Sequence, residues 1–157
     1  MTYTGDAGEV SGVHLKAGGV PTRQIGTTTA RYLATGSLTA GRYGLYRWDM
    51  GGPGGAEPHF HRTFSESFYV ISGTVGVYDG ATWADATVGD FHYVPEGGIH
   101  AFRNADPGTP ASMLILFAPG APRERYFDAL ADIVASGRQL SPEEWTKLYA
   151  DNDQYMV

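Results

Sequence analysis

Residues 57–73 read EPHFHRTFSESFYVISG, and residues 89–104 read GDFHYVPEGGIHAFRN. These two segments contain four of the five histidines of the chain. His59 and His61 are separated by one residue, so on a β-strand both imidazoles leave the same face. The first segment therefore predicts a strand that presents two histidine rings to one side of a sheet.

A carboxylate and a third imidazole follow this pair. Glu66 lies five residues after His61, an odd offset that would put it on the opposite face of a continuous strand, so residues 62–65 must break or bend the strand. His100 follows the turn sequence Pro-Glu-Gly-Gly and begins a new strand. His59, His61, Glu66 and His100, if they converge inside a small barrel, would form a divalent-metal site with one or two positions left for water, substrate or dioxygen. The alternative is that the histidines are exposed or hydrogen-bonded residues of ordinary strands.

The sequence around these segments predicts a body made almost entirely of strands. Gly and Pro together make up 31 of 157 residues, and they separate short stretches rich in aromatic and β-branched residues. Asp79-Gly80 is typical of a hairpin turn, and Ser72-Gly73 indicates another tight reversal. Many short strands with close turns favour a sandwich or barrel. The expected strands cover residues 31–35, 42–50, 66–71, 74–78, 82–84, 90–94, 99–104 and 112–117.

The two ends of the chain differ from this body. Residues 1–28 have weak periodicity and predict a mobile arm or an edge strand, and residues 29–119 form the predicted barrel. In residues 120–157, apolar side chains at helical spacing from Tyr126 to Val134 predict a helix that ends near Gly137. Ser141-Pro142-Glu143-Glu144 is a capping box that begins a second helix. We expect this C-terminal helical extension to pack on the β body or on a partner subunit, in a structural role.

Composition excludes several functional classes. A net charge of −6 disfavours nucleic-acid binding, and the absence of cysteine excludes disulfides, thiol nucleophiles and iron–sulfur clusters. No apolar run approaches the roughly 18 residues of a membrane span, and the first 20 residues lack the pattern of a signal peptide. We therefore expect a cytoplasmic protein that binds neither nucleic acid nor membranes.

The spacing of the two segments resembles the two motifs of the cupin family. The first motif is matched by His59-x-His61, then Glu66 and Gly73, and the second by Gly89, Pro95-x-Gly97, His100 and Asn104. The resemblance covers about residues 42–119. One position departs from it, because Pro53 stands where the family has a glycine six residues before the first histidine. Four neighbouring glycines keep that loop flexible.

The resemblance implies an all-β fold, a small jelly-roll β-barrel, to which the sequence pattern adds the C-terminal helical extension. It also implies a homodimer and one divalent transition metal per chain, held by His59, His61, Glu66 and His100. Iron, nickel, manganese, copper and zinc all accept these ligands. Asn104, the last residue of the second motif, is expected to stabilise a turn or strand end.

Three functions follow from the resemblance. The segment Glu57–His61 and the run from Gly89 to Pro95 are similar to the single-domain quercetin-dioxygenase-like cupins. That branch implies a dioxygenase that acts on a small aromatic or polyphenolic, flavonol-like substrate with dioxygen, with Glu66 as both ligand and catalytic base. The second possibility is a polyketide cyclase or isomerase that uses the metal only as a Lewis acid. The third is a cupin that binds a small molecule without turnover.

Strand parity indicates which side chains lie beside the metal. Phe68 and Val70 share the parity of Glu66, and Phe102 shares that of His100, so these three would line an apolar pocket. Trp48 is a further candidate on its own strand. The alternative is that all of these residues are ordinary core. The Pro95 turn separates His92 from His100, so His92 could be a partner of a ligand, an acid–base group or a surface residue.

Overall fold

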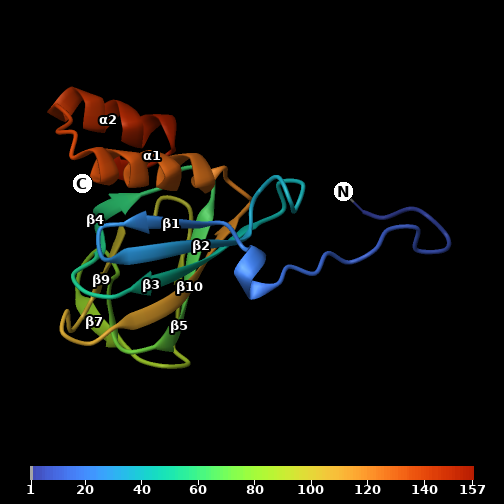
Figure 1. The fold of residues 1–157 in the computed structure, drawn as a ribbon, viewed down its shortest axis with the longest axis horizontal. Coiled ribbons are helices and arrows are strands. Elements are labelled where there is room, and N and C mark those ends of the chain that lie inside the picture. The colour runs from blue at the N-terminus through green and yellow to red at the C-terminus, as the bar shows by residue number, and fades with distance from the viewer. Residues whose placement is uncertain (1) are drawn as a thin grey trace.

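The structure, a computed structural model, describes residues 2–157 and consists of two β-sheets with a helical layer at one end (Figure 1). The larger sheet has the strand order β1-β2-β3-β10-β5-β8 and the smaller one β11-β4-β9-β6-β7. The strands of the larger sheet are β1 (Thr22–Ile25), β2 (Thr28–Ala34), β3 (Gly44–Met50), β5 (Ser65–Ser72), β8 (Phe91–Val94) and β10 (Ala111–Ala118). Those of the smaller sheet are β4 (Gly55–Phe60), β6 (Val75–Tyr78), β7 (Trp83–Ala86), β9 (His100–Asn104) and β11 (Tyr155–Met156).

All strand pairs are antiparallel, and the sheets bury their facing sides. In β2 and β3 every second residue is buried, as expected for strands that cover a core with one face. The core is rich in aromatic residues; Tyr46, Phe64, Phe68 and Phe117 are each about 1% exposed or less. The predicted all-β jelly-roll with a C-terminal helical extension is therefore confirmed, as two facing sheets.

The tight turns have the conformations that their sequences predict. Gly73 has a φ of +69° between β5 and β6, and a Cβ there would lie 2.5 Å from the backbone oxygen of Pro110, so only glycine fits. Asp79 accepts hydrogen bonds from the backbone N–H groups of Ala81 and Thr82 in the β6–β7 hairpin. Buried Asn104 donates to the backbone oxygens of Gly52 and Thr109 at 3.1 Å, which confirms its expected place at a strand end.

The N-terminal segment contributes an edge strand. Residues 2–16 have no regular secondary structure and extend away from the two sheets in Figure 1. A short 3₁₀-helix, η1 (Ala17–Gly19), precedes β1, which pairs with β2 at the edge of the larger sheet.

The C-terminal helices cover the open end between the sheets. Helix α1 (Arg123–Ser136) ends at Gly137 in the left-handed conformation, and α2 (Pro142–Asp151) begins with the predicted capping box of Ser141 and Glu144. The ring of Phe127 lies 4.9 Å from that of Trp48 and 5.2 Å from that of Tyr46, measured between centroids. Helix α1 therefore packs into the core of the β body. In residues 2–157 neither helix has the length and hydropathy that a bilayer crossing requires.

Candidate metal centre

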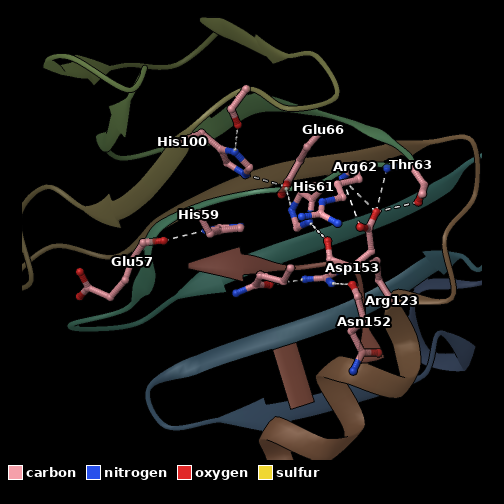
Figure 2. Close-up of polar contacts among 12 residues, drawn as sticks. Glu57, His59, His61, Arg62, Thr63, Glu66, His100, Arg123, Asn152 and Asp153 are labelled. Atoms are coloured by element: carbon pink, nitrogen blue, oxygen red, sulfur yellow. Dashed lines mark hydrogen bonds and ion pairs between the residues drawn. The ribbon is translucent and has the colours of Figure 1, made fainter. Parts of the chain in front are cut away.

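The four predicted ligands lie together between the two sheets. His59 belongs to β4, His61 follows that strand directly, Glu66 belongs to β5 and His100 begins β9. One ligand atom from each residue lies within 4.8 Å of the other three, and all four residues are buried (Figure 2). This is the only such group of histidine and acidic side chains in residues 2–157 that combines three imidazoles with a carboxylate.

The break in the chain between His61 and Glu66 is what brings Glu66 into the site. Strand β4 ends at Phe60 in the smaller sheet, and β5 begins at Ser65 in the larger sheet. The intervening residues carry the chain from one sheet to the other, so the carboxylate faces the histidines from the opposite layer. The predicted interruption at residues 62–65 is confirmed.

Backbone carbonyl oxygens fix the orientation of each imidazole. A carbonyl oxygen only accepts hydrogen bonds, so each Nδ1 must carry the proton and each Nε2 keeps its lone pair in the neutral ring. This is the usual arrangement of metal-binding histidines. The Nδ1 contacts are His59 to the oxygen of Glu57 at 2.6 Å, His61 to that of Asp153 at 2.6 Å and His100 to that of Gly98 at 3.0 Å.

The donor atoms around Glu66 fit a divalent cation. The Glu66 Oε2 atom lies 3.1 Å from His61 Nε2 and 2.9 Å from His100 Nε2. With Nδ1 protonated, each contact sets a lone pair against a carboxylate oxygen, and only a proton or a metal ion between the atoms removes the repulsion. Two ligands at right angles, each about 2.1 Å from one ion, would be about 3.0 Å apart. These distances and the N₃O donor set suit a transition metal.

The negative charge of Glu66 also makes the cluster attractive to a cation. Burial, together with repulsion from His100, lowers the pKa of His59 to about 3, so this ring is neutral at physiological pH. Burial by itself would raise the pKa of Glu66, but its contacts with His100 and His61 outweigh burial and hold that pKa well below its ordinary value. Burial by itself would lower the pKa of His100. The contact with the Glu66 carboxylate raises it by more, so the pKa of His100 lies above its ordinary value. Glu66 is therefore an anion that attracts a cation to this position.

A cavity opens beside the cluster. Its volume is about 270 Å³, and both His59 and Glu66 belong to its wall. The rest of the wall is mostly aromatic and apolar, and half of it comes from the C-terminal extension. The residues that the extension contributes are Arg123, Tyr126, Phe127, Leu130, Trp145, Tyr149, Gln154 and Met156.

The predicted pocket residues divide into two groups. Trp48 and Phe102 line the cavity, and their rings meet edge to face at 6.4 Å. Phe68, Val70 and His92 are not part of its wall. Phe68 and Val70 do face inward, but the Phe68 ring lies 5.5 Å from Phe102 and fills the space behind it as core. Strand parity correctly predicted which side chains face inward. The position of each residue along its strand decided which of these side chains reach the cavity.

His92 is half-buried beside Phe68. Its ring lies 5.9 Å from the ring of Phe68, opposite that residue in the β5–β8 pairing. Burial and repulsion from His100 lower its pKa, and its Nε2 has no hydrogen-bond partner in the part of the chain that the structure describes. His92 thus lies beside Phe68 in the larger sheet and is not part of the cavity wall.

Asp153, which no motif of the sequence indicates, supports the cluster from the C-terminal segment. Its backbone oxygen accepts the Nδ1 proton of His61, and its carboxylate accepts hydrogen bonds from the backbone N–H groups of Arg62 and Thr63 (Figure 2). Asp153 has a positive φ of 52°, a conformation more often taken by Gly, Asn or Asp. The contact spans 92 residues, so no local sequence pattern reveals it.

Arg123 is the second functional candidate from the extension. It is 4% exposed, lines the cavity, and donates from Nη1 to the backbone oxygen of Asn152 at 2.9 Å and from Nη2 to Oε1 of Gln154 at 3.0 Å. The extension, expected to be structural, therefore also builds one wall of the cavity and holds the candidate ligand His61 in place. The spacing of apolar residues in this helix does not reveal the role of Arg123. That spacing shows which apolar side chains are buried, and Arg123 is a charged residue at the first position of the helix.

Comparisons with known proteins agree with this geometry. Residues 46–117 match the family model described as a cupin domain. No curated protein matches the sequence. Among solved structures, the polyketide cyclase RemF from Streptomyces resistomycificus is 22% identical, with a TM-score of 0.60 over 69% of this chain and 80% of its own.

Two further structures have the same fold. An RmlC-like cupin from Shewanella frigidimarina is 19% identical, with a TM-score of 0.59 over 69% of this chain and 92% of its own. A predicted oxalate decarboxylase from Thermotoga maritima is 13% identical, with a TM-score of 0.59 over 68% of this chain and 99% of its own. With the paired motifs, the two facing sheets and the buried cluster, these matches show that residues 46–117 form a cupin domain and that the chain has the fold of the cupin superfamily.

Proposed function

We propose that this cupin is a metal-dependent dioxygenase that acts on a small aromatic or polyphenolic substrate. The observation that carries the proposal is the position of the buried cluster at the wall of an aromatic cavity. His59 and Glu66 line that cavity, so a molecule bound there lies against the donor atoms. The volume of about 270 Å³ and the aromatic wall suit a small planar molecule.

Different residues of this chain would bind the metal, transfer the proton and position the substrate. The three histidines and Glu66 would hold one divalent transition metal, which supplies Lewis acidity and, if it is redox-active, a means of reacting with dioxygen. Glu66 lies at the cavity wall, so its carboxylate is placed to accept the proton of a substrate hydroxyl. The side chains of Trp48, Phe102 and Phe127 exclude water and hold the aromatic ring beside the cluster.

A second function uses the same residues without dioxygen. The structure of a polyketide cyclase is among those similar to this chain, which favours ring closure or isomerisation of a carbonyl compound as the alternative. There the metal would polarise the carbonyl and Glu66 would move the proton. Retention of turnover without dioxygen separates this alternative from dioxygenase chemistry.

The first test is metal content. Protein purified without chelators or an affinity tag is expected to hold about one divalent metal per chain by elemental analysis. Replacing His59, His61 or His100 with Ala is expected to remove most of the metal, because three ligands seldom retain it as four do. His14→Ala is the matched control, since His14 is exposed in the N-terminal segment. Full occupancy in all three cluster variants would refute the metal assignment.

The second test is turnover. Metal-loaded protein is screened against flavonols and smaller polyphenols while oxygen uptake is followed, with the metal-deficient His100→Ala protein as the blank. Oxygen uptake stoichiometric with substrate loss supports the dioxygenase. Turnover of a polyketide-like carbonyl compound at the same rate with and without air supports the cyclase or isomerase. Tight substrate binding with no turnover under either condition would mean that this cupin is a binding protein.

A further inference from the structure

Helix α2 forms the solvent side of the cavity. Its two residues in the cavity wall, Trp145 and Tyr149, are both half-buried. In the same wall, His59 and Glu66 of the metal cluster are 3% and 4% exposed. The helix itself has no fully buried residue and lies beyond α1, away from the strands, in Figure 1. The cavity therefore extends from the buried cluster to a wall made of two side chains that also contact solvent.

Two stacked aromatic rings make up this wall. Trp145 and Tyr149 are four residues apart, so their side chains leave the same face of α2. Their ring centroids are 5.4 Å apart, with 23° between the ring planes. The ring of Tyr149 also lies 6.4 Å from that of Tyr126, which is 5.9 Å from the ring of Phe127 in the core. The wall is therefore continuous with the packed aromatic core, and a ligand cannot push it aside without disturbing those contacts.

Strand β4 meets α2 at the rim of the cavity. Gly55, Ala56 and Glu57 of this strand belong to the cavity wall. Burial and the negative charge of Glu57 raise the pKa of Tyr149, so the Tyr149 hydroxyl lies close enough to Glu57 to be affected by that charge. The cavity that these elements enclose has a volume of about 270 Å³, below the range of roughly 300–1,000 Å³ that is usual for small-molecule sites. The space suits one ring system.

The C-terminal end of α2 is fixed relative to the metal cluster. The backbone oxygen of Asn152, directly after the helix, accepts a hydrogen bond from Arg123 at 2.9 Å. The backbone oxygen of Asp153 accepts the Nδ1 proton of His61 at 2.6 Å, and strand β11 then pairs with β4. Helix α2 continues directly into this segment, so the contacts that orient His61 also set the distance between the aromatic wall and the cluster.

We propose that Trp145 and Tyr149 are specificity-determining residues, which limit the substrate to a single ring system. A substrate whose hydroxyl group lies against His59 and Glu66 would direct the far edge of its ring at the α2 wall. A second ring attached at that edge would have to displace the stacked side chains, which costs binding energy in a packed site. This inference rests on the proposed function for the orientation of the hydroxyl group, and it narrows the substrate class from polyphenols in general to single-ring phenols.

The test compares catechol with 4-phenylcatechol, which has the same diol and one additional ring. Binding to the Zn²⁺-loaded protein is measured by titration calorimetry without dioxygen, so that no turnover interferes. Wild type is expected to bind catechol at least about tenfold more tightly than 4-phenylcatechol, because the second ring must displace the wall. Trp145→Ala is expected to bind 4-phenylcatechol at least about tenfold more tightly than wild type does, and to change the affinity for catechol by less than about threefold.

Trp83→Ala is the matched control, since Trp83 is an exposed tryptophan of β7 outside the cavity wall, and it is expected to keep the wild-type preference. Trp145→Phe keeps a ring at the wall and is expected to keep most of the preference. Tyr149→Ala is the deciding variant if Trp145→Ala does not fold. The proposal is overturned if wild type binds neither ligand, if it binds both equally, or if the variant tested keeps the preference or weakens both ligands equally.

The same titrations with metal-free protein separate this inference from the proposed function. If the protein proves to hold no metal yet prefers catechol, and the preference depends on Trp145, the proposed function fails and the size limit stands. If metal-loaded wild type turns over catechol and 4-phenylcatechol with equal kcat/KM, the proposed function is supported and the size limit is refuted.

Discussion

Glu66 is the residue on which the site depends most, because it is the one anion among three imidazoles. Its Oε2 atom lies 3.1 Å and 2.9 Å from two different histidines, and the residue is 4% exposed. Neutral His59 and ionised Glu66 together give the cluster the charge of a cation site. A single substitution at Glu66 can therefore separate metal binding from proton transfer.

Glu66→Gln keeps the shape of the side chain and removes its charge and basicity. The variant is expected to keep part of its metal, since three imidazoles remain, and to lose turnover by about a hundredfold or more if the carboxylate is the base. Metal content and the rate constant are measured on the same preparation. Unchanged turnover would mean that Glu66 is a ligand at most.

Asp49 gives a prediction for stability and pH. Its carboxylate accepts hydrogen bonds from Arg31, Arg47 and Ser112 at 2.7–2.8 Å. Burial alone would raise the pKa of Asp49, but these partners outweigh it and lower that pKa. A lowered folded-state pKa stabilises the protein above the unfolded pKa of about 3.9, and the stabilisation is lost as the pH falls through the folded value.

Asp49→Asn is therefore expected to destabilise the protein by about 1 kcal/mol at pH 7, and by less as the pH falls below about 4. Urea unfolding of both proteins at several pH values measures the difference. Asp85→Asn, an exposed acid of β7 for which no ion pair is found in residues 2–157, is the control. A difference independent of pH would show that the ionised carboxylate contributes nothing.

At the scale of elements, most strands followed from local patterns. Each of the eight expected strands is present, with shifts of one to three residues at most ends, because alternation and turn residues are short-range signals. Strand β4 is not among these eight, although the spacing of His59 and His61 indicates it. Strand β1 was expected only as one of two alternatives, an arm or an edge strand, since three of its four residues are exposed and show no alternation. Strand β11 has only two residues and exists because it pairs with Phe60 and His59 of β4.

This short C-terminal strand leads to a prediction about metal affinity. Deleting residues 152–157 removes the Asp153 oxygen that holds His61, the pairing with β4 and both hydrogen-bond acceptors of the Arg123 side chain. The affinity for Zn²⁺ is expected to fall 10- to 100-fold while the β-sheet circular dichroism is retained. Deletion of residues 2–7, which are exposed, is the control of equal length. Unchanged Zn²⁺ affinity in the C-terminal deletion would refute a supporting role for this segment.

At the scale of the whole molecule, the metal would connect the two sheets. His59 and His100 belong to the smaller sheet and Glu66 to the larger one, so an ion held by all of them would crosslink both layers. A ligand that binds only the folded state stabilises it, by about 4 kcal/mol at a thousand times its Kd.

Saturating Zn²⁺ is therefore expected to raise the Tm of metal-stripped protein by roughly 10 °C, at about 2–4 °C per kcal/mol for a chain of this size. Differential scanning calorimetry measures the shift. His100→Ala is expected to show little of it and His14→Ala all of it. An equal shift in His100→Ala would place the bound ion elsewhere.

The sequence by itself determined the jelly-roll class, most strands, both helices and the four residues that come together, because alternation, turn glycines and caps act over a few residues. Only the tertiary structure decided what surrounds that cluster. Asp153 meets His61 across 92 residues, and Arg123 reaches the cavity because α1 packs over the open end of the two sheets, with Phe127 against Trp48. Such contacts depend on how far each element penetrates the core, and local periodicity carries no information about that depth.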